Sequence, residues 1–205
     1  MRFKPTRAPR LDGEDVLKLD GAEVGRVGDF WAWAYSDLRE NVTRGLLAEY
    51  LVGRALGCEL GTRSAWDNYD LVTPEEIRVE VKASAYLQSW PQRELSKIQF
   101  SGLKGRSWRA DGSYGARPEY RADVYVFCVQ TAQAHVEYDM LDVGQWEVYV
   151  LPRDVVVEHG AASMALATVR RFAGAPVPWT ELRAVVCALH ARRSEASLAD
   201  EKVGV

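Results

Sequence analysis

The hexapeptide Ile77-Arg78-Val79-Glu80-Val81-Lys82 alternates apolar and charged side chains. Side chains of a β-strand point to opposite faces in turn, so the pattern predicts a strand with one apolar and one charged face. We expect the apolar face to pack on the core, which leaves Arg78, Glu80 and Lys82 together on the other face. A carboxylate and an amine held side by side are groups that metal-assisted hydrolysis uses.

The preceding residues supply a second acid for the same face. Strands are predicted at about 68–73 and 77–83, on either side of the turn Pro74-Glu75-Glu76. If this three-residue turn closes a hairpin, Thr73 faces Ile77 and Asp70 faces Glu80. Directly opposed Cβ atoms in such a pair lie about 4.5–5.5 Å apart.

Two carboxylates placed in this way repel each other unless a cation lies between them. Mg²⁺ is commonly held by one or two carboxylates together with waters and phosphate oxygens, and Mn²⁺ accepts the same oxygen ligands. Lys82 is then placed to orient or deprotonate an attacking water. The equal alternative is an exposed polar hairpin face on which Arg78 and Lys82 neutralise the acids.

A third acid comes from the helix predicted over residues 42–56. At 100° per residue its polar side chains gather on one side, whereas Glu49 falls on the opposite, apolar side. Gly45 and Gly53 lie one turn before and after Glu49 and allow another group to approach closely. A carboxylate on an apolar face is costly unless it is paired. We expect Glu49 to lie above the hairpin and to reach the metal through water; the alternative is a buried ion pair with an arginine.

In order, spacing and faces, these pieces resemble the PD-(D/E)xK restriction-endonuclease-like superfamily. They are Arg44 to Tyr50 on the helix, Tyr69-Asp70-Leu71, and Val79 to Ser84 with its Glu-x-Lys. The resemblance covers about residues 41–130 and implies an α-β-β-β-α-β core and a Mg²⁺-dependent endonuclease that hydrolyses phosphodiester bonds in DNA.

The resemblance also assigns roles. It implies Asp70 and Glu80 as metal ligands, Lys82 as the catalytic lysine and Glu49 as the accessory acid. The Pro that often precedes the Asp is replaced by Tyr69. Asp67 is a rival for the first ligand, but it lies on the opposite face from Asp70 if the strand has already begun.

The segment 84–121 has the composition of a long functional loop with at most one helix. From Arg93 to Arg121 it contains seven basic and three acidic residues, a net charge of +4 in a chain of net charge −3. Cations, amides and aromatic rings suit phosphate contacts and stacking on unpaired bases. A solvated basic loop is the alternative. The candidate nucleic-acid contacts are Gln88, Lys97, Lys104, Arg106, Trp108 and Arg109.

The composition is that of a single globular domain and argues against several other classes of protein. With 205 residues, 47% hydrophobic and 27% charged, the chain has enough apolar residues for one packed domain. Its three cysteines are widely spaced, which argues against a disulfide framework or a zinc site. No Walker, GxGxxG or GxSxG motif is present. No apolar run approaches the about 18 residues of a membrane span, and no signal peptide is evident, so we expect a cytoplasmic protein without membrane association.

The remaining pattern predicts a single α/β domain over residues 1–205. Its core is expected at about 41–151, as a mixed sheet flanked by helices with extra helices after it, and 1–20 and 194–205 are expected to be a flexible arm and tail. Asp29 and Asn41 are expected to cap helices, Gly57 to end one, and residues 58–66 to be irregular or a short strand. Further strands are predicted at 123–130 and 146–151, and helices after Pro152, near 161–172 and near 179–193.

Three hypotheses follow. The first is a Mg²⁺-dependent nuclease acting on DNA, in which a homodimer is expected because cutting both strands usually takes two active centres. The second is a nucleic-acid-binding module that keeps the nuclease fold but performs no chemistry. The third is a partner-binding α/β protein in which Glu49 and Arg78 only form a buried ion pair.

Overall fold

The computed structural model describes the chain except for residues 1–5, 7, 66, 110–111 and 204–205, and it describes no side chains beyond residue 192. The centre is a four-stranded mixed sheet with the order β3-β4-β6-β7. Its strands are β3 (Leu71–Val72), β4 (Arg78–Ala85), β6 (Val124–Gln130) and β7 (Trp146–Pro152). β4 and β6 are parallel, and the other neighbours are antiparallel. The expected α/β domain with a mixed central sheet and flanking helices is thus confirmed.

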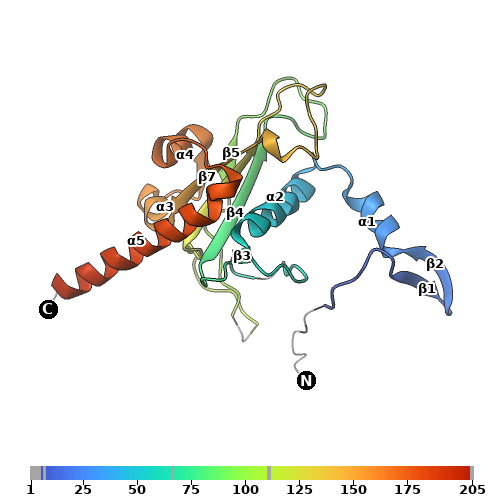
Figure 1. Ribbon diagram of the computed structural model, residues 1–205, viewed down its shortest axis with the longest axis horizontal. Helices are drawn as coiled ribbons and strands as arrows, with labels where there is room; N and C mark the ends of the chain where they lie inside the picture. The colour runs from blue at the N-terminus through green and yellow to red at the C-terminus, as the bar shows by residue number, and fades with distance from the viewer. Residues whose placement is uncertain (1–5, 7, 66, 110–111, 204–205) are drawn as a thin grey trace.

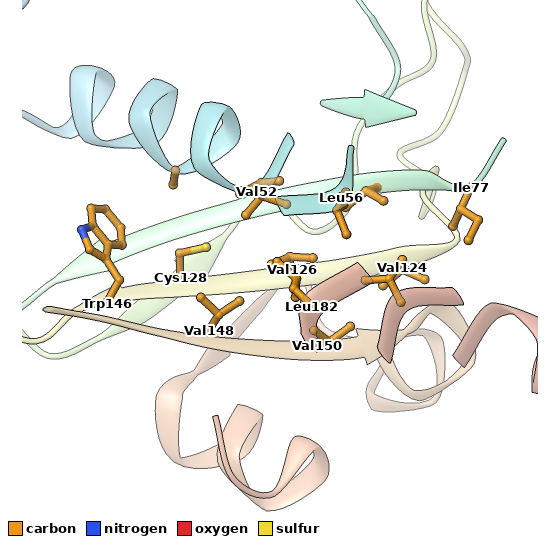
Figure 2. Close-up of a cluster of buried hydrophobic side chains, with 14 residues drawn as sticks. Val52, Leu56, Ile77, Val124, Val126, Cys128, Trp146, Val148, Val150 and Leu182 are labelled. Carbon is orange, nitrogen blue, oxygen red and sulfur yellow. The ribbon is translucent and has the colours of Figure 1, made fainter. Parts of the chain in front are cut away.

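Helices and small strands cover both faces of the sheet. One face packs against α2 (Asn41–Leu56) and the start of α5 (Leu182–Val203), in the core drawn in Figure 2. The other face packs against α3 (Arg153–His159), α4 (Leu166–Ala173), β5 (Gln99–Ser101) and β8 (Ser163–Ala165). Because β6 is covered on both faces, all seven of its residues are buried, which explains its nearly continuous apolar sequence. Two short 3₁₀ helices, Val143–Gln145 and Trp179–Glu181, precede β7 and α5.

The predicted helix over 42–56 is confirmed with one change at its start. The helix α2 begins at Asn41, and the capping residue is Glu40, whose carboxylate accepts hydrogen bonds from the N–H groups of Val42 and Thr43. Asn41 is therefore not the cap. The helix ends at Gly57 as expected, because this residue adopts a left-handed φ of 71°.

The N-terminal residues form more structure than the expected arm. β1 (Val16–Leu19) and β2 (Ala22–Arg26) make a hairpin around Asp20 and Gly21, which both have positive φ, as a tight hairpin turn requires. Helix α1 (Val27–Tyr35) follows, and its cap is Arg26, so the expected capping by Asp29 is wrong. Figure 1 shows this N-terminal unit, residues 12–35, standing apart from the sheet.

Two elements of the expected α-β-β-β-α-β core are missing from the described residues. Between Gly57 and Asn68 no strand forms in the part that the structure describes, and the connection from β4 to β6 contains no helix among its described residues. This connection, here called the excursion (residues 86–123), is broken by Pro91, Pro118 and several glycines. It instead carries β5 and an irregular hairpin with bridges from Gly105 to Glu119 and from Trp108 to Tyr114.

The C-terminal helix is longer than expected. We predicted its end near residue 193, but α5 continues to Val203. No helix in the described part of the chain has the length and apolar character needed to cross a lipid bilayer.

Candidate active site

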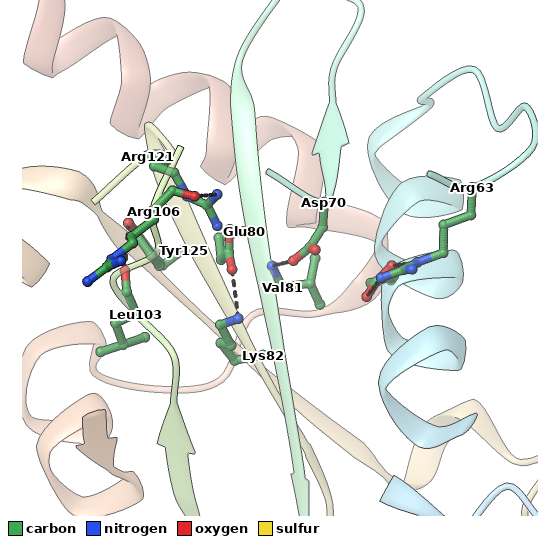
Figure 3. A network of polar contacts seen from close by, with 10 residues as sticks. Arg63, Asp70, Glu80, Val81, Lys82, Leu103, Arg106, Arg121 and Tyr125 are labelled. Carbon is green, nitrogen blue, oxygen red and sulfur yellow. Dashed lines mark hydrogen bonds and ion pairs between the residues drawn. The ribbon is translucent and has the colours of Figure 1, made fainter. Parts of the chain in front are cut away.

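The hairpin of β3 and β4 has the register that the turn predicts. Leu71 pairs with Val79 and Val72 with Arg78, and the N–H of Thr73 donates to the carbonyl of Ile77 over 3.0 Å. Continuing this register places Asp70 opposite Glu80, directly beyond the last paired residue of β3. There the Asp70 carboxylate takes the place of a backbone partner and accepts a 2.8 Å hydrogen bond from the N–H of Val81 (Figure 3).

The faces of β4 are also as expected. Ile77, Val79 and Val81 belong to the core under α2. On the opposite face the Lys82 Nζ lies 2.7 Å from Glu80 Oε1. The side chain of Glu80 is only 9% exposed and that of Lys82 22% exposed, so these two side chains do not form the solvent-exposed face of the alternative, although Lys82 neutralises Glu80 as that alternative expected. A buried Glu–Lys pair contributes little net stability, because desolvation offsets the attraction of the charges, and partly buried titratable groups are common at functional sites.

Residues from the excursion and from β6 surround this ion pair. A Cβ at Gly102 would lie 3.8 Å from the Lys82 Nζ, so the lysine reaches the backbone of the excursion. Tyr125 on β6 pairs with Glu80 in the parallel register, and its hydroxyl donates to the Leu103 carbonyl over 3.3 Å. Burial, and then the charge of Glu80, raise the pKa of Tyr125 to about 12. The phenol is therefore a neutral hydrogen-bond donor over the ordinary pH range.

The other acids of the cluster change the pKa of Asp70. Burial, then the charge of Glu80 and then that of Glu49 together raise the pKa of Asp70 to about 7. The Val81 N–H and the charge of Lys82 oppose this shift of the pKa without cancelling it. A carboxylate that is difficult to ionise beside two others is stabilised by any added cation, because the cation reverses the sign of the repulsion.

Glu49 is held by an arginine that the sequence did not identify. The Arg63 guanidinium grips it bidentately, with Nη2 at 2.8 Å from Oε1 and Nε on Oε2. Glu49 is partly buried, with its side chain 15% exposed. The predicted division of the α2 faces is wrong in part, because Thr43 and Arg44 are buried and Val42 is exposed. The alternative of an ion pair with an arginine is thus the observed contact. Arg78 is not that arginine, because it binds Asp123 at 2.6 and 2.8 Å, so the Glu49–Arg78 pair of the third hypothesis is wrong.

The two glycines beside Glu49 differ in their surroundings. A Cβ at Gly53 would lie 2.7 Å from a Leu60 methyl and 3.2 Å from a Leu71 methyl, whereas a Cβ at Gly45 would meet no atom within 4 Å. The expected close approach therefore occurs at Gly53 alone, and it is made by the segment that carries Arg63 and by β3. Gly53 thereby brings the Arg63 segment and β3 close to the face of α2 that presents Glu49.

A pocket of about 330 Å³ opens beside Glu49, Arg63 and Asp70, and neither Glu80 nor Lys82 lines it. Its described lining comes from α2, from residues 58–64 and from residues 67–72, and includes four acids and one arginine. These are Glu49, Glu59, Asp67, Asp70 and Arg63. Asp67, the rival ligand, is exposed on the wall of this pocket. The excess of carboxylates makes the pocket attractive to cations and unfavourable for a free anion.

The described residues contain no group of three or more His, Cys, Asp or Glu side chains arranged to hold a metal ion. Each of the three acids instead has a donor from the protein: Arg63 on Glu49, the Val81 N–H on Asp70, and Lys82 on Glu80. Asp70 and Glu80 still match the one or two carboxylates that Mg²⁺ takes from a protein when water and phosphate oxygens complete its shell. The residues therefore fit a two-carboxylate site better than a three-acid site.

Gln88 does not lie where a substrate contact requires it to be. Its side chain is buried, its Oε1 accepts from Arg44, and its Nε2 donates to the Ala85 carbonyl and to Ser96 Oγ. The expected nucleic-acid contact is therefore not supported, because the Gln88 side chain turns inward after β4. Gln88 instead ties α2 to the start of the excursion, and we leave it out of the proposed interface.

The other predicted contacts lie along the excursion. Lys97, Arg106 and Arg109 are exposed, and Trp108 is 40% exposed and packs edge-on against Tyr114 at 4.9 Å between ring centroids. Lys104 is more constrained, because it donates to the Gly160 carbonyl and lies over the Tyr120 ring.

Asn68, two residues before Asp70, anchors the excursion. Its Oδ1 accepts from the Trp108 N–H over 2.9 Å and from Arg121 over 3.3 Å. Arg121 in turn donates to the carbonyl of Arg106. The basic excursion is thus fixed beside the acid cluster. Neither Asn68 nor Arg63 could be found from the sequence, because each acts on residues that only the fold brings near.

Comparison with known proteins adds no family: no protein-family model matches the chain, and no curated protein sequence matches it.

Proposed function

We propose that this protein is a metal-dependent nuclease of the PD-(D/E)xK type, which hydrolyses phosphodiester bonds in DNA. The observation that carries the proposal is the arrangement of Asp70, Glu80 and Lys82 at one end of the β3–β4 hairpin. The charge of Glu80 raises the pKa of Asp70, so the two acids repel each other, and an amine lies 2.7 Å from Glu80. Such an arrangement is unfavourable for folding alone, so it calls for a function that uses it.

The residues divide the work as follows. Asp70 and Glu80 would hold Mg²⁺ or Mn²⁺, which polarises a phosphate and lowers the pKa of a bound water. Lys82 lies on the same face as Glu80 and is placed to orient the attacking water and to offset charge on the phosphate. Glu49 adds negative charge at the edge of the site, and its proposed contact with the metal is through water.

The excursion supplies the proposed nucleic-acid surface. Lys97, Arg106 and Arg109 offer exposed charges for phosphates, while Trp108 offers a ring for stacking. Lys104 is assigned a smaller part, since it already has a carbonyl partner. The anchoring of Trp108 by Asn68 keeps this surface close to Asp70. DNA as the substrate, rather than RNA, rests on the resemblance described above.

The finer fold is part of the same proposal. Helix α2 and strands β3, β4 and β6 occur in the order that a restriction-endonuclease-like core has, and β4 and β6 are parallel neighbours. The first strand and the second helix of that core have no counterpart in the described residues. We propose a reduced core in which the excursion replaces the helix that usually links the last two strands.

The decisive test is cleavage of supercoiled plasmid and of single-stranded DNA with Mg²⁺, with Mn²⁺ and with EDTA. We expect cleavage by the wild type only with metal, and none by Lys82→Ala. Arg192→Ala is the matched control, because it removes an exposed cation from α5 that belongs neither to the site nor to the proposed dimer contact. Cleavage by Lys82→Ala at the wild-type rate would exclude the assigned role of the lysine.

One observation favours the non-cleaving alternative, a module that binds nucleic acid without cutting it. Arg63 neutralises Glu49 and Lys82 neutralises Glu80, so two of the three acids are already stabilised without a metal ion. Gel-shift binding that needs no metal, with no cleavage across Mg²⁺ and Mn²⁺, would establish this alternative and exclude the nuclease.

A homodimer remains a proposal as well. The N-terminal unit exposes apolar side chains, among them Trp33 at 84%, Leu19 at 64% and Val24 at 61%. A two-stranded sheet with one short helix is marginally stable in water by itself. We assign to this surface the contact with a second copy, which would supply the second active centre for duplex cleavage.

A further inference from the structure

Arg63 is not one of the predicted catalytic residues, but its side chain lies among the acids of the site. Its guanidinium fork holds both oxygens of Glu49, yet the arginine side chain remains 47% exposed. Arg63 also lines the acidic pocket together with Asp67 and Asp70. Its pKa is raised by Glu49 first, and also by the charges of Asp70 and Asp67. Arg63 is therefore a positive charge shared among three carboxylates.

A divalent cation at Asp70 and Glu80 would carry the charge that Arg63 now supplies. Two cations next to the same small set of acids repel each other, and the gain from Glu49 is then divided between them. The arginine is the mobile partner, because it is half exposed and extends from the irregular segment 58–64, whereas Glu49 is fixed on α2.

We propose that Arg63 competes with the divalent cation for Glu49 and, when released, binds the substrate phosphate next to the one that is cut. This inference rests on the proposed nuclease function and deepens it. The planar fork that fits a carboxylate also fits a phosphate, which a lysine cannot match bidentately. Without metal, Arg63 neutralises the charge of Glu49. With metal bound, Arg63 is a positioning residue that contacts a substrate phosphate.

According to this proposal, removing the Arg63 side chain should strengthen metal binding and weaken substrate binding. In Arg63→Ala the acids lose their counter-charge, so Mn²⁺ should bind about 2- to 5-fold more tightly, the range expected for loss of one competing ion pair. The same variant loses a phosphate contact, so its KM for DNA should rise by about tenfold with Mn²⁺ saturating. A variant that only misfolds would lose both metal binding and cleavage.

The experiment is a Mn²⁺ titration of the full chain by calorimetry, followed by cleavage kinetics. Arg54→Ala is the control, because it removes an exposed arginine from α2 and should change both quantities by less than about twofold. Arg63→Lys keeps the charge but not the fork, so its metal affinity should stay near the wild type while KM still rises. In the wild type, Mg²⁺ should shift the Arg63 Nε–H resonance, which tests the release without any substitution.

The outcomes separate the two proposals. If the wild type binds Mn²⁺ and cleaves DNA but Arg63→Ala binds Mn²⁺ no more tightly, the role of Arg63 is wrong and the nuclease stands. An Arg63 resonance unmoved by Mg²⁺ leads to the same conclusion. If the wild type neither binds Mn²⁺ nor cleaves DNA, both the nuclease and the role of Arg63 are overturned.

Discussion

The Nζ of Lys82 lies 2.7 Å from the Oε1 of Glu80, and the Glu80 side chain is only 9% exposed. This contact makes the lysine a structural partner as well as a catalytic candidate. Removing Lys82 leaves a buried carboxylate without its cation, so Lys82→Met should lower the free energy of unfolding by about 1–3 kcal/mol. Chemical denaturation at neutral pH measures this change.

The double variant Lys82→Met/Glu80→Gln tests whether the ion pair is the cause. It removes both charges and should recover most of the lost stability, while cleavage stays absent because both groups are needed for it. A double variant as unstable as Lys82→Met would mean that the lysine stabilises the fold through its packing rather than through Glu80.

The stability of the protein should depend on pH through Asp70. Its pKa rises from 3.8 to about 7 on folding, so between these values the native state binds a proton that the unfolded chain has lost. Stability contributed by this group therefore falls as pH rises from about 4 to about 7. Asp70→Asn is neutral throughout and keeps an acceptor for the Val81 N–H. In EDTA we expect the stability of Asp70→Asn to match that of the wild type near pH 4 and to exceed it by up to about 4 kcal/mol at pH 8.

The same group should govern the pH dependence of cleavage. Metal binding needs the ionised carboxylate, so activity at limiting Mg²⁺ should increase as pH rises through about 7. Higher Mg²⁺ should move the midpoint to lower pH, because the cation favours the ionised form. A midpoint that is independent of metal concentration would assign the titration to another group.

The excursion should set the salt dependence of nucleic-acid binding. Each arginine that contacts a duplex phosphate adds about 0.9 to the slope of log K against log salt. Arg106→Ala/Arg109→Ala should therefore reduce that slope by about 1.8, whereas the control Arg54→Ala/Arg192→Ala should leave it unchanged. Fluorescence anisotropy at several salt concentrations gives both slopes. Equal slopes in the two double variants would place the binding surface elsewhere.

Stacking by Trp108 should be visible on single strands. Its ring is 40% exposed beside Tyr114, and stacking on a base contributes about 1–3 kcal/mol. Trp108→Ala should weaken single-strand binding by that amount and duplex binding by less. An equal loss on both forms would indicate a contact with the backbone of the nucleic acid instead.

The two glycines of α2 provide a matched test of the packing that brings the Arg63 segment and β3 onto this helix. Gly45→Ala should stabilise the protein by up to about 1 kcal/mol, because alanine favours helix and the position is open. Gly53→Ala gains the same propensity but forces Leu60 and Leu71 to move. We expect Gly53→Ala to be less stable than Gly45→Ala by about 1 kcal/mol or more, as measured by thermal unfolding.

The sequence by itself determined the parts of the site that depend on local geometry. Alternation placed Glu80 and Lys82 on one face, helical periodicity indicated that Glu49 is partly buried, and the three-residue turn determined the hairpin register. These inferences held because strand and helix periods and turn lengths are short-range properties of the chain.

Only the tertiary structure decided which groups act on these residues. Arg63 reaches Glu49 across a turn of irregular chain, Asn68 fixes Trp108 forty residues later, and Gln88 turns inward toward Arg44. The absence of a helix among the described residues of the excursion was also settled there, since its apolar residues Ile98, Phe100 and Leu103 pack on the sheet individually. Such contacts join residues that are distant along the chain, and no periodicity records them, because they depend on how the whole sheet and its covering layers pack.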